Sequence, residues 1–118
     1  MALNDQEANL EYAELLWAQD KQTEAIKSLS QIIDEDIFKN KKQKARAQLQ
    51  YAIWLDESNH TSSSTIINEY EQARQLEPTW EKPYYDLGKY YNKIMESRHD
   101  STGYYEVQTI RFAAYIYI

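Results

Sequence analysis

Apolar residues recur at spacings of three and four along most of the chain, which is the pattern of amphipathic α-helices. Short runs of polar and turn-forming residues separate these stretches. The pattern predicts helices over residues 5–19, 23–35, 43–57, 64–76, 80–95 and 104–118. Because the turn at residues 20–22 is short, we expect the first two helices to lie side by side and antiparallel.

The apolar positions within each helix predict the core. The stripe of the first helix consists of Ala8, Tyr12, Leu15, Leu16 and Ala18, with Trp17 at its edge. The apolar positions of the second helix are Ala25, Ile26, Leu29, Ile32 and Ile33. Those of the third are Ala45, Ala47, Leu49, Ala52, Ile53 and Leu55, with the bulky Tyr51 and Trp54. Those of the fourth are Ile66, Ile67, Tyr70, Ala73 and Leu76.

The densest group of aromatic residues lies in residues 76–95, in a chain that has three Trp and eleven Tyr. Pro78 disfavours continuation of the preceding helix, and Thr79 is a good N-cap for a helix over residues 80–95. Pro83 is compatible with this helix because it falls in the first turn, where the backbone N–H has no helical partner.

Polar and turn-forming residues at 97–103 predict a loop before the last helix. The final Tyr-Ile-Tyr-Ile also has the alternation of a β-strand, but residues 107–114 favour a helix. An apolar helical turn at the end of a chain leads us to expect that the chain is cut from a longer protein.

A repeat of 34 residues relates the third and fifth helices, since Ile53 and Leu87 are 34 positions apart. One helix of a tetratricopeptide repeat carries a bulky residue followed by Leu, Gly and Tyr, and Tyr84, Leu87, Gly88 and Tyr91 match these positions. Tyr70, Ala73 and Pro78 match the second half of such a repeat. A small residue allows two helices to approach closely, and one helical pair cannot bury its apolar face alone. The predicted fold class is therefore all-α, with antiparallel helical pairs stacked as a tetratricopeptide-like α-solenoid.

Composition excludes several classes of protein. The formal charge of −6 argues against a surface that mainly binds nucleic acid. The chain has no cysteine, so it has neither disulfides nor thiolate chemistry. No apolar run approaches the roughly 20 residues of a membrane span, and the first residues do not form a signal peptide.

No catalytic constellation is found, and we expect no catalytic, cofactor-binding or metal-binding residue in this segment. His60 and His99 lie in separate polar loops without cysteine partners. With two glycines in the chain, neither a dinucleotide-binding glycine motif nor a phosphate-binding loop can be formed. The 19 carboxylates are typical of solvated helix faces, and none is singled out as an acid or base.

Two surfaces are candidates for contacts. Lys82, Tyr85, Lys89 and Asn92 follow spacings of three, four and three, so they share one helix face. This face is either an ordinary exposed surface or a contact surface for another chain or another part of the same protein. Basic residues at 39–46 either lead into a solvated first turn or form a partner or phosphate site.

Adjacent tyrosines fill grooves between helices more readily than they form a base-stacking platform.

The aromatic stretch resembles the FAT domain of phosphatidylinositol-3-kinase-related protein kinases, and most of all the ATR-type checkpoint kinases, including fungal ones. The family pattern is a helix ending in Tyr-x-x-Ala-x-x-Leu-x-Pro, then Trp-Glu, then a Leu-Gly-Lys-Tyr-Tyr helix. The residues that carry it, called the signature residues below, are Trp54, Tyr70, Ala73, Pro78, Trp80, Leu87, Gly88, Tyr90 and Tyr91.

The resemblance implies that residues 1–118 belong to a FAT α-solenoid, with helical pairs at about residues 5–35, 43–76 and 80–118. It implies a non-catalytic scaffold that clamps and regulates the kinase domain of a large nuclear serine/threonine kinase of the DNA-damage and replication-stress checkpoint. ATP and magnesium would bind only in that kinase domain. The implied partners are neighbouring solenoid helices and the kinase domain of the same chain, with a regulatory subunit or a homodimer partner as further candidates, and neither nucleic acid nor membrane is among them.

A free-standing tetratricopeptide adaptor that binds peptides is the alternative. It requires Asn, Lys and Arg at the concave positions of successive repeats. In the third helix we expect these positions to be Gln48, Tyr51, Leu55 and Ser58, which are poor residues for clamping a peptide.

Overall fold

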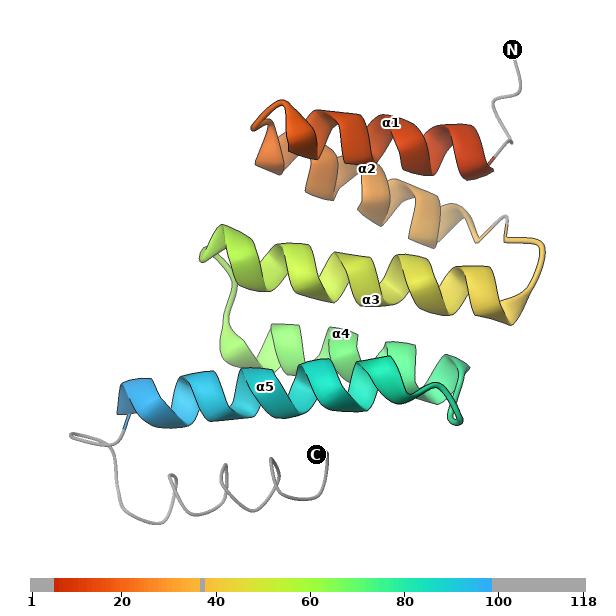
Figure 1. The fold of residues 1–118 in the computed structure, drawn as a ribbon. Coiled ribbons are helices and arrows are strands. Elements are labelled where there is room, and N and C mark those ends of the chain that lie inside the picture. Colours follow the sequence, from red (N-terminus) through yellow and green to blue (C-terminus); the bar gives the residue numbers. More distant parts are fainter. Residues whose placement is uncertain (1–5, 37, 99–118) are drawn as a thin grey trace. The chain divides into compact units, whose positions relative to one another are not determined.

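A computed structural model describes residues 6–36 and 38–98 of the chain (Figure 1). These residues form five α-helices: α1 Gln6–Ala18, α2 Gln22–Glu35, α3 Lys41–Ser58, α4 Ser63–Leu76 and α5 Glu81–Arg98. No strand occurs within the described ranges, so the all-α class is confirmed. The helix expected at residues 104–118, with its strand alternative, lies outside them.

The chain divides into two compact units, Met1–Glu77 and Pro78–Ile118. The first unit contains α1 to α4, and α5 belongs to the second. In the first unit, α1 packs antiparallel to α2, and α3 packs antiparallel to α4 (Figure 1). The contact of α2 with α3 joins the two pairs. This is the predicted stack of antiparallel helical pairs, a tetratricopeptide-like α-solenoid.

The junction of the two pairs has an apolar core with contributions from α1, α2 and α3. Small residues alternate with large ones in it, which allows the helix backbones to approach closely. Its buried members are Ala13, Leu16, Ala25, Leu29, Ala47 and Trp54. Partly buried side chains, among them Leu10, Trp17 and Ile33, pack around this cluster.

The predicted core stripe of α1 is wrong in part. Leu16 is buried as expected, but Tyr12 and Leu15 are 57% and 54% exposed. The buried position next to Leu16 in the core is Ala13, and Trp17 packs against the same cluster. The helix is therefore rotated so that Ala13, Leu16 and Trp17 face the core, and Ala8 and Ala18 of the predicted stripe are exposed as well. Tyr12 and Leu15 form a second apolar face that the first unit leaves exposed.

Three turns of the first unit use left-handed backbone conformations without glycine. Asp20, Asp36 and Asn59 have φ angles of 65°, 52° and 62°. Asp and Asn tolerate this conformation better than most residues because their short polar side chains can hydrogen-bond locally. Asp36 and Asn59 are the C-caps of α2 and α3. The chain can thus turn sharply although it has few glycines.

The start of α3 lies two residues earlier than predicted because Asn40 caps it. The Asn40 side-chain oxygen accepts a hydrogen bond from the Gln43 backbone N–H at 2.9 Å. In return, the Gln43 side-chain oxygen accepts from the Lys39 backbone N–H at 3.3 Å. These reciprocal bonds satisfy backbone donors at the helix start. The Nζ of Lys44 also lies 3.0 Å from a carboxylate oxygen of Asp36.

The helix of the second unit differs from the prediction at both ends. It begins at Glu81, one residue later than predicted. Pro83 lies in the first turn, as expected, and is fully buried. The helix continues through Arg98, so the predicted loop does not begin at residue 97. Arg is a good helix former, and the polar character of these positions does not by itself end a helix.

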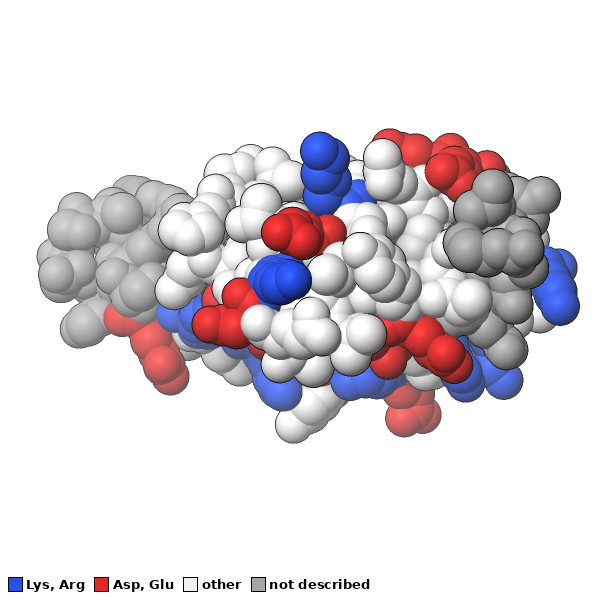
Figure 2. Space-filling model, turned by 90° about the horizontal axis from the view of Figure 1, so that it is seen from above, with Lys and Arg blue, Asp and Glu red and all other residues white. Residues whose placement is uncertain are grey.

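Acidic and basic side chains are interspersed over the face of the molecule shown in Figure 2. This mixture agrees with a formal charge of −6 that is distributed along the chain. Among the described residues in this view, Lys and Arg do not form a continuous basic stripe of the kind that nucleic-acid-binding surfaces carry.

Candidate functional site

The candidate contact face lies on α5, because the residues at 82, 85, 89 and 92 share one side of that helix. Lys82, Tyr85 and Lys89 are exposed, and Asn92 is half-buried. The Nζ of Lys89 lies 5.1 Å from the centroid of the Tyr85 ring, which is the geometry of a cation–π contact. The face therefore presents an aromatic ring flanked by positive charge. Its role as a contact surface stays a prediction.

Asp86 fixes the position of one residue of this face, and the sequence analysis missed it. Its carboxylate is buried, and one of its oxygens lies 3.1 Å from the Nζ of Lys82 one turn earlier. Because the Lys82 side chain is 56% exposed, solvent screens the pair and its contribution to stability is small. Its main effect is on geometry, since it holds the Lys82 ammonium close to the helix. The only signal in the sequence is the spacing of four between a lysine and an aspartate.

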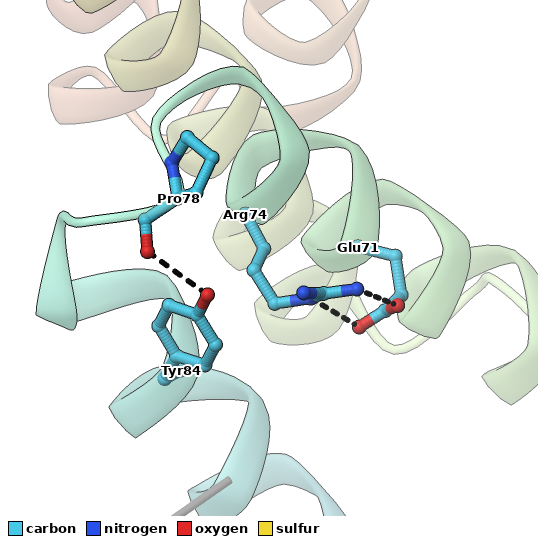
Figure 3. Close-up of polar contacts among 4 residues, drawn as sticks. All are labelled: Glu71, Arg74, Pro78 and Tyr84. Carbon is cyan, nitrogen blue, oxygen red and sulfur yellow. Dashed lines mark hydrogen bonds and ion pairs between the residues drawn. The ribbon is translucent and has the colours of Figure 1, made fainter.

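The turn before α5 is closed by a side chain from the helix itself. The Tyr84 hydroxyl donates a hydrogen bond to the Pro78 carbonyl at 2.9 Å (Figure 3). Pro78 is exposed and Trp80 is half-buried. Pro78 and Trp80 thus lie in a turn that is stabilised by Tyr84, a residue that the sequence indicated only as a position of the repeat pattern.

The remaining signature residues of the second unit lie within α5. Leu87, Gly88 and Tyr90 are buried, and Tyr91 is half-buried. Tyr90 is buried whereas Tyr85 is 57% exposed, so the tyrosines of this helix divide between its interior and its surface. Positions 85 and 90 are five residues apart and so point about 140° apart around a helix of 3.6 residues per turn, which accounts for the difference.

In the first unit the signature residues Trp54, Tyr70 and Ala73 are all buried. Trp54 stacks on Trp17 of α1, with the two rings 4.7 Å apart between centroids. These positions therefore have packing roles. Near them on α4, Arg74 forms two hydrogen bonds to the Glu71 carboxylate, at 2.9 and 3.1 Å (Figure 3).

Gln48 is a buried polar residue, although the repeat pattern predicts it on an exposed concave surface. Its Nε2 donates a hydrogen bond to a side-chain oxygen of Glu69 on α4 at 2.7 Å. Gln48 and Leu55 were expected on a concave surface of α3, but both are buried. They therefore cannot line a peptide-binding groove. Gln48 instead joins the two helices of the second pair.

Within residues 6–36 and 38–98 no group of three or more His, Asp or Glu side chains could hold a metal ion. His60 lies exposed in the turn between α3 and α4, and His99 lies outside the described residues. None of the described helices is long and apolar enough to cross a membrane.

Comparison with known proteins identifies the family to which this helical chain is similar. The FAT domain family matches residues 1–115 of the chain. The serine/threonine-protein kinase MEC1 of Candida albicans is 55% identical over 111 residues, and MEC1 of Candida glabrata is 33% identical over 113 residues. These matches cover 94% and 93% of this chain but 5% of each kinase. No solved structure matches it.

The chain therefore belongs to the FAT domain family. Its sequence is that of a FAT segment of the ATR-type phosphatidylinositol-3-kinase-related kinases. The serine/threonine-protein kinase ATR of Arabidopsis thaliana extends this relationship beyond fungi, with 39% identity over 57 residues that cover 48% of the chain and 2% of that kinase.

Proposed function

We propose that this chain is a non-catalytic scaffold and regulatory segment of a large nuclear serine/threonine kinase that acts in the DNA-damage and replication-stress checkpoint. In this role it clamps the kinase domain of its parent protein and transmits regulatory signals to it. Phosphoryl transfer, with ATP and magnesium, takes place in the kinase domain. The observation that carries the proposal is the FAT match over residues 1–115, together with the identity to MEC1 kinases.

The packing of the first unit supports a mechanical role. Two helical pairs share a core of buried residues, and Trp54 of one pair stacks on Trp17 of the other. Side chains that are in direct contact across the two pairs, such as these stacked rings, resist compression. A displacement applied to one pair is therefore passed to the next rather than absorbed between them.

The candidate contact face, called the α5 face from here on, supplies the surface through which this segment contacts its partners. It consists of Lys82, Tyr85, Lys89 and Asn92. An exposed tyrosine beside two lysines suits a partner surface with an apolar patch and carboxylates. The proposed partners are the neighbouring solenoid helices and the kinase domain of the parent protein, and a regulatory subunit or a second copy would use the same chemistry. The adaptor alternative is not favoured, since the relatives are kinases and Gln48 and Leu55 are buried.

The test uses the full-length parent kinase with Lys82→Gln and Lys89→Glu together, since glutamine at position 82 can still donate a hydrogen bond to the buried Asp86 carboxylate. The matched control carries Lys21→Gln and Lys27→Glu, which change two exposed lysines of the first unit in the same way. Protein abundance, phosphorylation of a peptide substrate with ATP and magnesium, and cell survival in hydroxyurea are measured. We expect normal abundance for both proteins, with kinase activity and survival reduced only for the α5 variant.

Activity and survival equal to those of the control would show that the α5 face is an ordinary exposed surface. The proposed class of function is tested separately by deleting residues 6–98 from the parent. A parent that keeps its regulated activity and its protection against hydroxyurea after this deletion would contradict the scaffold role itself.

A further inference from the structure

A cavity of about 200 Å³ lies between α1 and α3 in the first unit, and it takes no part in the function proposed above. Its apolar lining comes from the core at the junction of the two pairs, and polar side chains stand beside it. The lining residues are Leu10, Ala13, Leu29, Ala47 and Trp54, with Glu14, Arg46 and Gln50 as the polar members. We refer to it as the α1–α3 groove.

The two walls of the α1–α3 groove carry opposite charges. Glu14 of α1 and Arg46 of α3 are both exposed, and each has a residue of like charge one turn earlier, Glu11 and Lys42. No ion pair joins the walls, and among the described residues none of these four side chains has another charged partner. Their charges are therefore available to a partner that enters between them.

The volume of the groove limits what can bind. Sites for cofactors and drug-sized ligands measure roughly 300 to 1,000 Å³, so about 200 Å³ is too small for a nucleotide. It is sufficient for one bulky apolar side chain, and the Trp54 indole supplies an aromatic wall for it. A single side chain anchored in a small apolar pocket is the usual form of a hot spot between proteins.

The charges also distinguish among ligands. A phosphate group or a nucleic-acid backbone would meet Arg46 but would be repelled by Glu14 on the other wall. Among the basic residues at 39–46, Lys44 is engaged by Asp36, which leaves fewer cations for a purely anionic ligand. A segment with both signs of charge satisfies both walls.

We propose that the α1–α3 groove binds a segment of a partner protein that inserts one bulky apolar side chain. An acidic residue on one side of that anchor pairs with Arg46, and a basic residue on the other side pairs with Glu14. The groove belongs to the first unit, whereas the α5 face belongs to the second.

The test measures binding of fluorescein-labelled synthetic peptides to the 118-residue chain by anisotropy. The probe peptide has a central Phe flanked by Asp and Arg within a Gly and Ser background. One control peptide replaces Phe with Ser, and another replaces Asp and Arg with Ser. We expect each control to bind at least about tenfold more weakly than the probe, because anchor and charges act together.

Charge reversal on the protein gives the decisive comparison. Arg46→Glu makes both walls acidic, so the probe should lose at least about tenfold in affinity, while a peptide with Arg on both sides of Phe should gain. Lys27→Glu, an exposed lysine on α2 outside the groove, should change neither. Thermal melting of both variants checks that these exposed substitutions leave the fold intact.

A probe that binds no better than its Ser-centred control would overturn the proposal, and so would affinity that Arg46→Glu leaves unchanged. The proposal is supported if the peptide with Arg on both sides of Phe binds the Arg46→Glu variant more tightly than the unchanged chain, and binds the Lys27→Glu variant no more tightly. The α5 variants described above are expected to bind the probe normally, so failure of this proposal and failure of the proposed scaffold role can be told apart.

Discussion

The indole rings of Trp17 and Trp54 lie parallel, with 2° between their planes and 4.7 Å between their centroids. Flat rings touch at about 3.5 Å, so the larger centroid distance means that the rings are offset rather than directly superposed. One ring comes from α1 and the other from α3. The stack therefore fastens the first helical pair to the second.

Loss of this stack should weaken the first unit. Trp54 is 4% exposed, so Trp54→Ala should lower the free energy of unfolding by about 3–5 kcal/mol. Trp17→Ala should cost less because Trp17 is only half-buried. In urea melts of both single variants and the double variant, we expect a coupling energy of about 0.5–1.5 kcal/mol beyond loss of buried area. A coupling energy near zero would mean that each ring packs independently.

The helices could be predicted from the sequence because their periodicity is a local property. The face that each helix buries could not always be predicted. In α1 apolar residues occur on two faces, and the predicted stripe combines Leu16 with Tyr12 and Leu15. Tertiary packing buries Leu16 together with Ala13 and leaves Tyr12 and Leu15 exposed, because the small Ala13 side chain lets α1 approach its neighbours.

Adjacent leucines of α1 provide a direct measure of this orientation. Leu16 is 6% exposed, so Leu16→Ala should cost about 2–5 kcal/mol. Leu15 is 54% exposed, and Leu15→Ala should change stability by less than about 0.5 kcal/mol. Both variants remove the same atoms from the same helix, so each is the control for the other. Equal losses in thermal or urea melts would show that both apolar faces of α1 are covered.

The bond between Gln48 and Glu69 should stabilise the pairing of α3 with α4. Gln48→Leu keeps a similar volume but removes the donor, so we expect a loss of about 1–3 kcal/mol for a hydrogen bond to a charged group. Glu69→Gln retains an acceptor oxygen and should cost less. If Gln48→Leu unfolds at the same urea concentration as the unchanged chain, the hydrogen bond contributes nothing net and apolar packing compensates.

This hydrogen bond is an example of a contact that cannot be predicted from the local sequence. Gln48 and Glu69 are 21 residues apart, and nothing in either local pattern indicates that a polar residue of α3 is buried. The α5 face is different. Its four residues share one helix, so their alignment follows from spacing alone, whereas the partner that binds them depends on chemistry outside the chain.

The turn between α1 and α2 should respond to backbone preference rather than to side-chain contacts. Asp20 has a φ of 65° and is exposed. Asp20→Gly relieves the steric cost of this conformation and should be neutral or slightly stabilising, whereas Asp20→Ala should be about 1 kcal/mol less stable than Asp20→Gly. Thermal melts of the two variants measure the difference directly. An alanine variant as stable as the glycine variant would mean that the turn readily adopts another conformation.

The tyrosines of α5 should separate folding from contact. Tyr90 is 5% exposed, and Tyr90→Ala should lower stability by about 3–5 kcal/mol, as for other large aromatic truncations. Tyr85 is 57% exposed, so Tyr85→Ala should cost less than about 1 kcal/mol, although it removes the ring that the Lys89 ammonium approaches. Stability is measured on the 118-residue chain, and kinase activity is measured on the parent carrying Tyr85→Ala, with Tyr85→Phe as the control that keeps the ring. We expect Tyr85→Ala to reduce activity at normal protein abundance and Tyr85→Phe to leave it unchanged. A large loss of stability in Tyr85→Ala would assign this ring to the core of the second unit and remove it from the contact face.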